Sequence, residues 1–228
     1  ATPASFIAHQ ISRNMYEEIA GDFLQTDVDV FIGGGLKYFN NRKDQINLVE
    51  KLKKNNYQIA YSLDEAVKVK SGKLAGLFYE NHCPPMPERG DMLPKSVMAA
   101  IDILDNNKKG FFLMVEGSQI DWAAHDNDKK QIVKEMLDFD ETIGKVLDYA
   151  QKDGNTLVII TADHETGGMT ILNGKFGYDE MDAHFSTKNH SGVPVPIYAF
   201  GPGAEQFTGI MENTAFKGKI EKLLDLKK

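Results

Sequence analysis

The sequence predicts an α/β fold in which a mainly parallel central sheet is flanked by helices. Helical and strand patterns alternate along nearly the whole chain. The stretch TLVIITADHE, residues 156–165, begins with continuous apolar and β-branched residues, which is typical of a strand covered on both faces. No linker, internal repeat or low-complexity tract interrupts the 228 residues, so one domain is expected over 1–228.

Composition and charge exclude several classes of protein. Hydrophobic residues make up 42% and charged residues 26% of the chain, as in an ordinary globular domain. The net charge of −7 comes without a basic stripe, which argues against a nucleic-acid binder. No apolar run approaches the roughly 18 residues that a membrane span needs. Cys83 is the single cysteine and cannot form an internal disulfide.

The first expected element is a helix at the very start of the chain. Thr2 followed by Pro3 resembles a helix N-cap with proline at the first helical position. Apolar residues then recur every four positions, at Ile7, Ile11, Met15 and Ile19. This spacing predicts one continuous helix with an apolar face.

Strands and a short helix follow in the first half. Strands are expected over 27–35, 57–62 and 74–79, and an amphipathic helix over 46–55. The proline-rich segment ENHCPPMPERGD, residues 80–91, should be irregular and lie at the surface.

The second half should contain three helices and three strands. The helices are expected over 94–107, 128–152 and near 212–226. The strands are expected over 111–116, 156–161 and 195–203.

Two of these strands run directly into side chains of the types that commonly bind metals. The first ends at Glu116, and the second is followed by Asp163 and His164. Ligands of open α/β sheets bind beyond the carboxyl ends of the strands. Because burying a charge without a partner is costly, these strand ends predict a metal site.

Further ligand-type residues occur close by. Asp121 and His125 are four residues apart, so one helical turn would direct both to the same side, and His190 precedes the last strand. Imidazole and carboxylate without thiolate favour a catalytic zinc or a similar ion over structural zinc. The set exceeds the needs of one tetrahedral ion, which favours a multi-metal hydrolytic site. The other histidines lack this context and are interpreted as ordinary residues: His9, His82 and His184.

Each of these pairs alone would more often be a surface pair or a helix cap. Their occurrence together at consecutive strand ends is what supports the interpretation as a metal site.

Three segments resemble the metal-binding segments of the alkaline phosphatase family: MVEGSQIDWAAHDND, VIITADHETGG and NHSGVPVPIYAFGPG. The start, ATPASFIAHQISR, resembles the family segment with a magnesium-ligand threonine and, eleven residues later, a phosphate-binding arginine.

The resemblance implies a role for each matching residue. Asp121, His125 and His190 would hold the first zinc. Asp163 and His164 would hold the second zinc, which lacks its remaining protein ligand here.

The start of the chain would supply further parts of the site. Thr2 and Glu116 would belong to an incomplete magnesium site, and Arg13 would bind two phosphate oxygens as a bidentate fork. The residue pattern alone would make Thr2 a helix cap and Arg13 a solvated helix residue. Trp122 stands where some relatives have Lys or His, which implies a less positive phosphate pocket.

The implied function is hydrolysis of phosphate monoesters to inorganic phosphate, with two zinc ions, magnesium and a phosphoserine intermediate. The family's nucleophilic serine and a metal-bridging aspartate lie upstream of the segment that matches Thr2. We therefore expect 1–228 to be the C-terminal portion of the full fold, incomplete at its N-terminus. We also expect this chain alone to be inactive or very weakly active.

The start of the chain has no initiator Met and no signal-peptide pattern, which suggests a processed, excised or truncated chain. The resemblance implies a periplasmic or secreted protein, and a homodimer is compatible with it.

Other interpretations of the function are also open. They are a non-catalytic zinc- and phosphate-binding fragment, another superfamily member such as a phosphodiesterase or phosphoglycerate mutase, and a structural α/β domain with surface acids.

Overall fold

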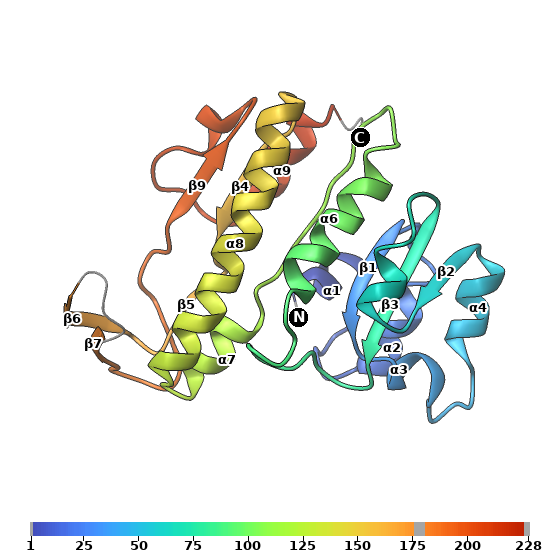
Figure 1. Cartoon of the computed structure of the whole chain (residues 1–228), viewed down its shortest axis with the longest axis horizontal. Coiled ribbons are helices and arrows are strands. Elements are labelled where there is room, and N and C mark those ends of the chain that lie inside the picture. Colours follow the sequence, from blue (N-terminus) through green and yellow to red (C-terminus); the bar gives the residue numbers. More distant parts are fainter. Residues whose placement is uncertain (1, 176–180, 226–228) are drawn as a thin grey trace. The chain divides into compact units, whose positions relative to one another are not determined.

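The computed structural model describes residues 2–175 and 181–225 (Figure 1). The chain forms two compact units, Ala1–Ser118 and Gln119–Lys228. Helices and a parallel sheet occur together, which confirms the predicted α/β class. The single domain expected over 1–228 stays a prediction.

The first unit is built on a parallel sheet of three strands. The strands are β1 (Val30–Gly34), β2 (Tyr57–Ala60) and β3 (Lys73–Tyr79), and their order is β1-β3-β2. The central strand β3 pairs Leu74 with Val30 of β1 and Lys73 with Tyr57 of β2. All three strands expected in this part of the sequence are confirmed.

The two faces of β3 enter different apolar clusters, because successive side chains of a strand point to opposite sides. Leu77 lies in a cluster with Leu52 of α4 (Leu48–Lys54). Leu74 packs in a second cluster with Ile103 of α6 (Met92–Leu104). Two short helices add to these clusters: α3 (Lys37–Asn40) places Phe39 in the first, and α5 (Leu63–Ala66) places Ala66 in the second.

The expected helix at the start of the chain is broken. The structure has α1 (Thr2–Ile7) and α2 (Tyr16–Asp22), and Ile11 between them is 98% exposed. The Ser12 hydroxyl oxygen accepts the backbone N–H of Asn14, and its carbonyl accepts that of Met15. Serine bonds of this kind compete with helical ones. The prediction of one continuous apolar face was therefore wrong.

The expected strand over 111–116 is also absent. Residues 111–117 form neither helix nor strand and pair with no strand in the described part of the chain. A strand pattern forms a ladder only beside a partner that takes its backbone N–H and C=O groups. Phe112 instead stacks on Phe6 of α1, with ring centroids 6.1 Å apart.

The second unit is dominated by one long helix, α8 (Lys129–Asp153). The Asp128 carboxylate caps its N-terminus by accepting the backbone N–H groups of Lys130 and Gln131. Gly154 ends it in the left-handed conformation, at φ 72°, which suits glycine because it has no Cβ. The shorter helices of this unit are α7 (Gln119–His125) and α9 (Ala215–Leu223), with a 3₁₀ turn at Ala204–Phe207.

In the described part of the second unit, the strands form three antiparallel pairs. They are β4 (Val158–Thr161) with β9 (Ile197–Phe200), β5 (Glu165–Thr166) with β8 (His190–Ser191), and β6 (Thr170–Gly174) with β7 (Met181–His184). The long helix α8 packs against β4 (Figure 1). Residues 158–160 are half-buried and Thr161 is exposed, so the predicted strand exists without being covered on both faces. None of the helices in the described ranges is both long and apolar enough to cross a membrane.

Leu52→Ala should lower the free energy of unfolding of the first unit by about 2–5 kcal/mol, because the fully buried side chain leaves a cavity. Urea unfolding followed by far-UV circular dichroism measures the change. Ile11→Ala is the matched control and should change stability by less than about 0.5 kcal/mol. Equal losses from both variants would contradict the assigned core.

Candidate metal centre

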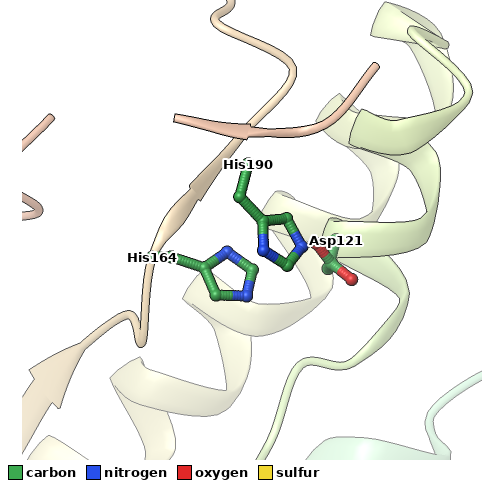
Figure 2. Close-up of side chains that lie close together, drawn as sticks. All are labelled: Asp121, His164 and His190. Carbon is green, nitrogen blue, oxygen red and sulfur yellow. Dashed lines mark ion pairs between the residues drawn. The ribbon is translucent and has the colours of Figure 1, made fainter. Parts of the chain in front are cut away.

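Three polar side chains from separate segments meet in the second unit (Figure 2). Asp121 belongs to α7, His164 to the turn after β4, and His190 to β8. Each offers one possible ligand atom, and these atoms lie within 4.8 Å of one another. Asp121 and His164 are half-buried, and His190 is exposed.

The helix α7 directs Asp121 and His125 to the same side, as their spacing predicts. His125 Nε2 lies 3.5 Å from Asp121 Oδ1. His190 Nε2 lies 3.8 Å from the same oxygen and 3.2 Å from His125 Nε2. The three residues expected at the first zinc are thus neighbours, and their role as ligands stays a prediction.

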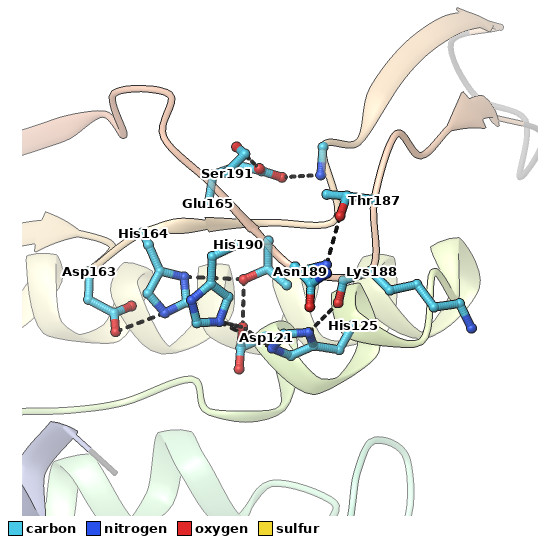
Figure 3. Close-up of polar contacts among 12 residues, drawn as sticks. Asp121, His125, Asp163, His164, Glu165, Thr187, Lys188, Asn189, His190 and Ser191 are labelled. Carbon is cyan, nitrogen blue, oxygen red and sulfur yellow. Dashed lines mark hydrogen bonds and ion pairs between the residues drawn. The ribbon is translucent and has the colours of Figure 1, made fainter.

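The other ring nitrogen of His125 has a backbone partner (Figure 3). Its Nδ1 lies 2.6 Å from the carbonyl oxygen of Lys188. A carbonyl oxygen only accepts, so Nδ1 carries the hydrogen and the lone pair of the ring is on Nε2. Ligating histidines are commonly oriented in this way.

The pair expected at the second zinc lies beside the first group. Asp163 and His164 follow β4, and His164 Nε2 is 3.3 Å from Asp163 Oδ2. The rings of His164 and His190 stack with their centroids 3.5 Å apart and 21° between their planes. The structure therefore gathers the five residues of both predicted zinc sets into one cluster (Figure 3).

Thr166 is a contact that the sequence analysis missed. Its hydroxyl donates to Asp121 Oδ1 at 2.6 Å and lies 3.2 Å from His164 Nδ1. The sequence did contain a signal for the contact with His164. Thr166 follows His164 by two residues, and alternate residues of an extended segment point to the same side. The contact with Asp121 spans 45 residues and had no local signature.

The pairing of β5 with β8 fixes these residues in register. Glu165 pairs with Ser191, and Thr166 pairs with His190. The Glu165 carboxylate also accepts the Ser191 hydroxyl and, at 2.7 Å, the backbone N–H of Gly168. These bonds hold the segments that carry His164 and His190 together.

The loop after β5 holds the segment before His190. The Gly167 carbonyl oxygen accepts the backbone N–H groups of Ser186 and Thr187, at 3.1 and 3.2 Å. The next residue, Gly168, has φ +59°, and a Cβ there would lie 1.9 Å from Ser186 Oγ. A side chain at this position would be strained and would displace Ser186.

The residues expected to bind magnesium and phosphate lie in the first unit. The backbone nitrogen of Thr2 is 3.5 Å from Glu116 Oε1, so these two residues are neighbours. Arg13 lies in the turn between α1 and α2 and is exposed, rather than on a helix. Trp122, on α7 of the second unit, is 47% exposed.

The donor set of the second unit suits a metal ion. It consists of imidazole and carboxylate groups without thiolate, from Asp121, His125, Asp163, His164 and His190. Zinc in catalytic sites takes such ligands and keeps an open position for water or substrate. The arrangement can therefore support metal-assisted chemistry on an anionic substrate.

Gly168→Ala should destabilise the second unit by about 1–3 kcal/mol, because alanine is strained at positive φ and contacts Ser186. Thermal unfolding followed by fluorescence of Trp122, the single tryptophan, measures this change. Gly144→Ala in α8, where no atom lies within 4 Å of the new Cβ, should instead stabilise by about 0.5–1 kcal/mol. The same sign for both variants would contradict the analysis.

Comparison with known proteins identifies relatives over the whole chain. The family model described as alkaline phosphatase matches residues 1–183. Alkaline phosphatase 4 of Bacillus subtilis is 32% identical over 300 aligned positions, which cover 98% of this chain and 65% of the relative. Alkaline phosphatase of Escherichia coli is 30% identical and is matched over 100% of this chain and 63% of its own length.

Solved structures agree in fold. The alkaline phosphatase from the Antarctic bacterium TAB5 has a TM-score of 0.93 and 42% identity, over 100% of this chain and 69% of its own. A variant of that enzyme with Mg bound in its M3 site has a TM-score of 0.90 and 40% identity, with the same coverage.

The match to the Escherichia coli relative covers the whole of this chain, whereas the family model ends at residue 183. The chain spans 65% of the length of the Bacillus relative and 63% of the Escherichia coli one. A family model over residues 1–183 and a relative of 32% identity agree with the grouping of Asp121, His164 and His190. On this evidence the chain belongs to the alkaline phosphatase family.

Proposed function

We propose that the protein to which these residues belong hydrolyses phosphate monoesters, with two zinc ions and one magnesium ion. The observation that carries the proposal is the cluster of histidine Nε2 atoms around Asp121 in the second unit. Family membership supports the reaction class. Phosphate monoesters would be the substrates and inorganic phosphate a product.

Two zinc ions are proposed for the second unit. Asp121, His125 and His190 would hold the first, and Asp163 and His164 would contribute to the second. When bound, the ions supply positive charge that stabilises the phosphoryl group and the leaving oxygen in the transition state. The chain's own contribution is to present Nε2 of His125, by engaging its Nδ1 with the Lys188 carbonyl.

Magnesium and phosphate roles are proposed for the first unit. The closeness of the Thr2 backbone to the Glu116 carboxylate supports a shared magnesium site, since oxygen ligands suit this ion. Arg13 would bind two phosphate oxygens, because its planar guanidinium matches them as a bidentate fork. Its exposure leaves it accessible to a phosphate group.

The nucleophile of the proposed reaction is a serine upstream of residue 1, which would form the phosphoserine intermediate. This assignment rests on the family resemblance of ATPASFIAHQISR. The same resemblance supports a periplasmic or secreted location, and a homodimer is compatible with it. For residues 1–228 on their own, the second candidate function is non-catalytic binding of zinc and phosphate. The upstream position of the serine favours it.

Added Zn²⁺ should stabilise this chain against thermal unfolding, because an ion that binds only the folded state shifts the equilibrium. Free zinc at 100 times its dissociation constant gives about 2.7 kcal/mol. Asp121→Ala should abolish most of this stabilisation, whereas His184→Ala on β7, outside the cluster, should retain it. Stabilisation that is unchanged in Asp121→Ala would refute the proposed zinc site.

A version of the protein extended upstream by about a hundred residues should hydrolyse an aryl phosphate, while residues 1–228 should show little or no turnover. Covalent catalysis needs the serine nucleophile. In the extended protein, Arg13→Ala should lower kcat/KM on the order of 100–1000-fold, comparable to loss of one oxyanion-binding group.

The turnover of an aryl phosphate monoester by the extended protein should be compared with the turnover of the corresponding diester. A preference for the monoester indicates a monoesterase, and a preference for the diester indicates a phosphodiesterase. Equal turnover by the short and extended versions would contradict the upstream nucleophile. Zinc and phosphate binding without turnover in the extended protein would establish the non-catalytic function instead.

A further inference from the structure

We infer that Thr166 is a positioning residue of the metal centre, which orients Asp121 and His164 for ion binding through its hydroxyl group. The inference rests on the zinc site proposed above. It is carried by the contacts of Thr166 in the second unit: its hydroxyl contacts Asp121 of α7 and His164, and its backbone pairs with His190 of β8.

The hydroxyl of Thr166 has one hydrogen to give, and it donates it to Asp121 Oδ1 at 2.6 Å. This distance lies in the range of strong hydrogen bonds from a hydroxyl to a carboxylate. The bond fixes the rotation of the carboxylate. An oriented carboxylate loses less conformational freedom when an ion binds.

The same hydroxyl oxygen lies 3.2 Å from His164 Nδ1. Because its hydrogen is directed to Asp121, the oxygen serves His164 as an acceptor, and Nδ1 carries the hydrogen of the ring. The lone pair of His164 is then on Nε2, the nitrogen that lies near Asp163. The Lys188 carbonyl oxygen acts on His125 in the same way.

The backbone of Thr166 is also tied to the third segment. Thr166 pairs with His190 in the β5–β8 ladder, and the neighbouring pair Glu165 and Ser191 is joined by a side-chain hydrogen bond. The register of Thr166 is therefore fixed independently of its hydroxyl. Removing the hydroxyl alone should leave the ladder in place.

A purely structural hydroxyl would act differently. It would tie α7 to β5 and change the unfolding temperature without metal, but it would have no specific effect on ion affinity. A positioning hydroxyl changes ion affinity while the metal-free stability is nearly constant. These two readouts are measured separately below.

The test uses residues 1–228 and Zn²⁺ in competition with a fluorescent chelator. Thr166→Val keeps the shape and removes the hydroxyl, and zinc affinity should fall 10–100-fold, as for other groups that orient metal ligands. Thr166→Ser restores the hydroxyl and should return affinity to within about threefold of the unchanged chain. The unfolding temperature in EDTA reports metal-free stability.

Thr161→Val is the matched control. The Thr161 hydroxyl also makes a long-range bond, to the carbonyl oxygen of Pro196 at 3.0 Å, and its other hydrogen bond goes to the carbonyl oxygen of Ala162 rather than to a residue of the cluster. The zinc affinity of the Thr161→Val variant should equal that of the unchanged chain. Equal affinity loss in Thr161→Val, unchanged affinity in Thr166→Val, or failure of Thr166→Ser to restore binding would each overturn the positioning role.

A second measurement does not depend on the folding of a variant. Imidazole ¹⁵N shifts of the metal-free chain, recorded with the ring neutral, should show His164 with its hydrogen on Nδ1. A neutral ring with its hydrogen on Nε2 would overturn the inference. If the unchanged chain binds no zinc, the proposed zinc site fails together with this inference. Zinc binding that Thr166→Val leaves intact overturns the inference alone.

Discussion

The ladder between β5 and β8 is two residues long, and the geometry of the metal centre depends on it. It sets Thr166 opposite His190 and Glu165 opposite Ser191, so the segments after β4 and before β9 cannot slide past each other. A slip by one residue would turn every side chain to the other face. The Glu165 carboxylate opposes such a slip by binding Ser191 and the Gly168 backbone.

Given that register, the polar groups of the cluster constrain one another. Asp121 Oδ1 faces the Nε2 atoms of His125 and His190, and it accepts the Thr166 hydroxyl. Half-buried acceptors gathered in this way need donors or a cation, since an unpaired buried polar group is costly. The Lys188 carbonyl oxygen accepts the Nδ1 hydrogen of His125, and the Thr166 hydroxyl oxygen accepts that of His164. The Nε2 lone pairs of both rings therefore face the cluster. This is why an ion suits the arrangement.

The first unit illustrates how local chemistry can override an apolar repeat. The spacing of Ile7, Ile11 and Met15 fits a helix, yet α1 ends at Ile7 and Ile11 is exposed. The hydroxyl and carbonyl oxygens of Ser12 then accept backbone N–H groups in a turn instead of a helix. The turn places Arg13 at the surface. The segment 111–117 likewise carries a strand pattern without forming one, because ladder formation needs a neighbouring backbone. A residue pattern gives a segment a preference for helix or strand. The hydrogen-bond partners around the segment then decide whether that element forms.

Patterns in the sequence were sufficient to predict the α/β class, the three parallel strands and the pairing of Asp121 with His125. Each depends on interactions within one element or on short periodicity, and the family resemblance added Thr2 and Arg13. Tertiary structure alone decided the approach of His190 to Asp121, the stacking of His164 on His190, and the contact of Thr166 with Asp121. These contacts join residues 26 to 69 positions apart. Their geometry depends on chain closure and strand register, which no local pattern encodes.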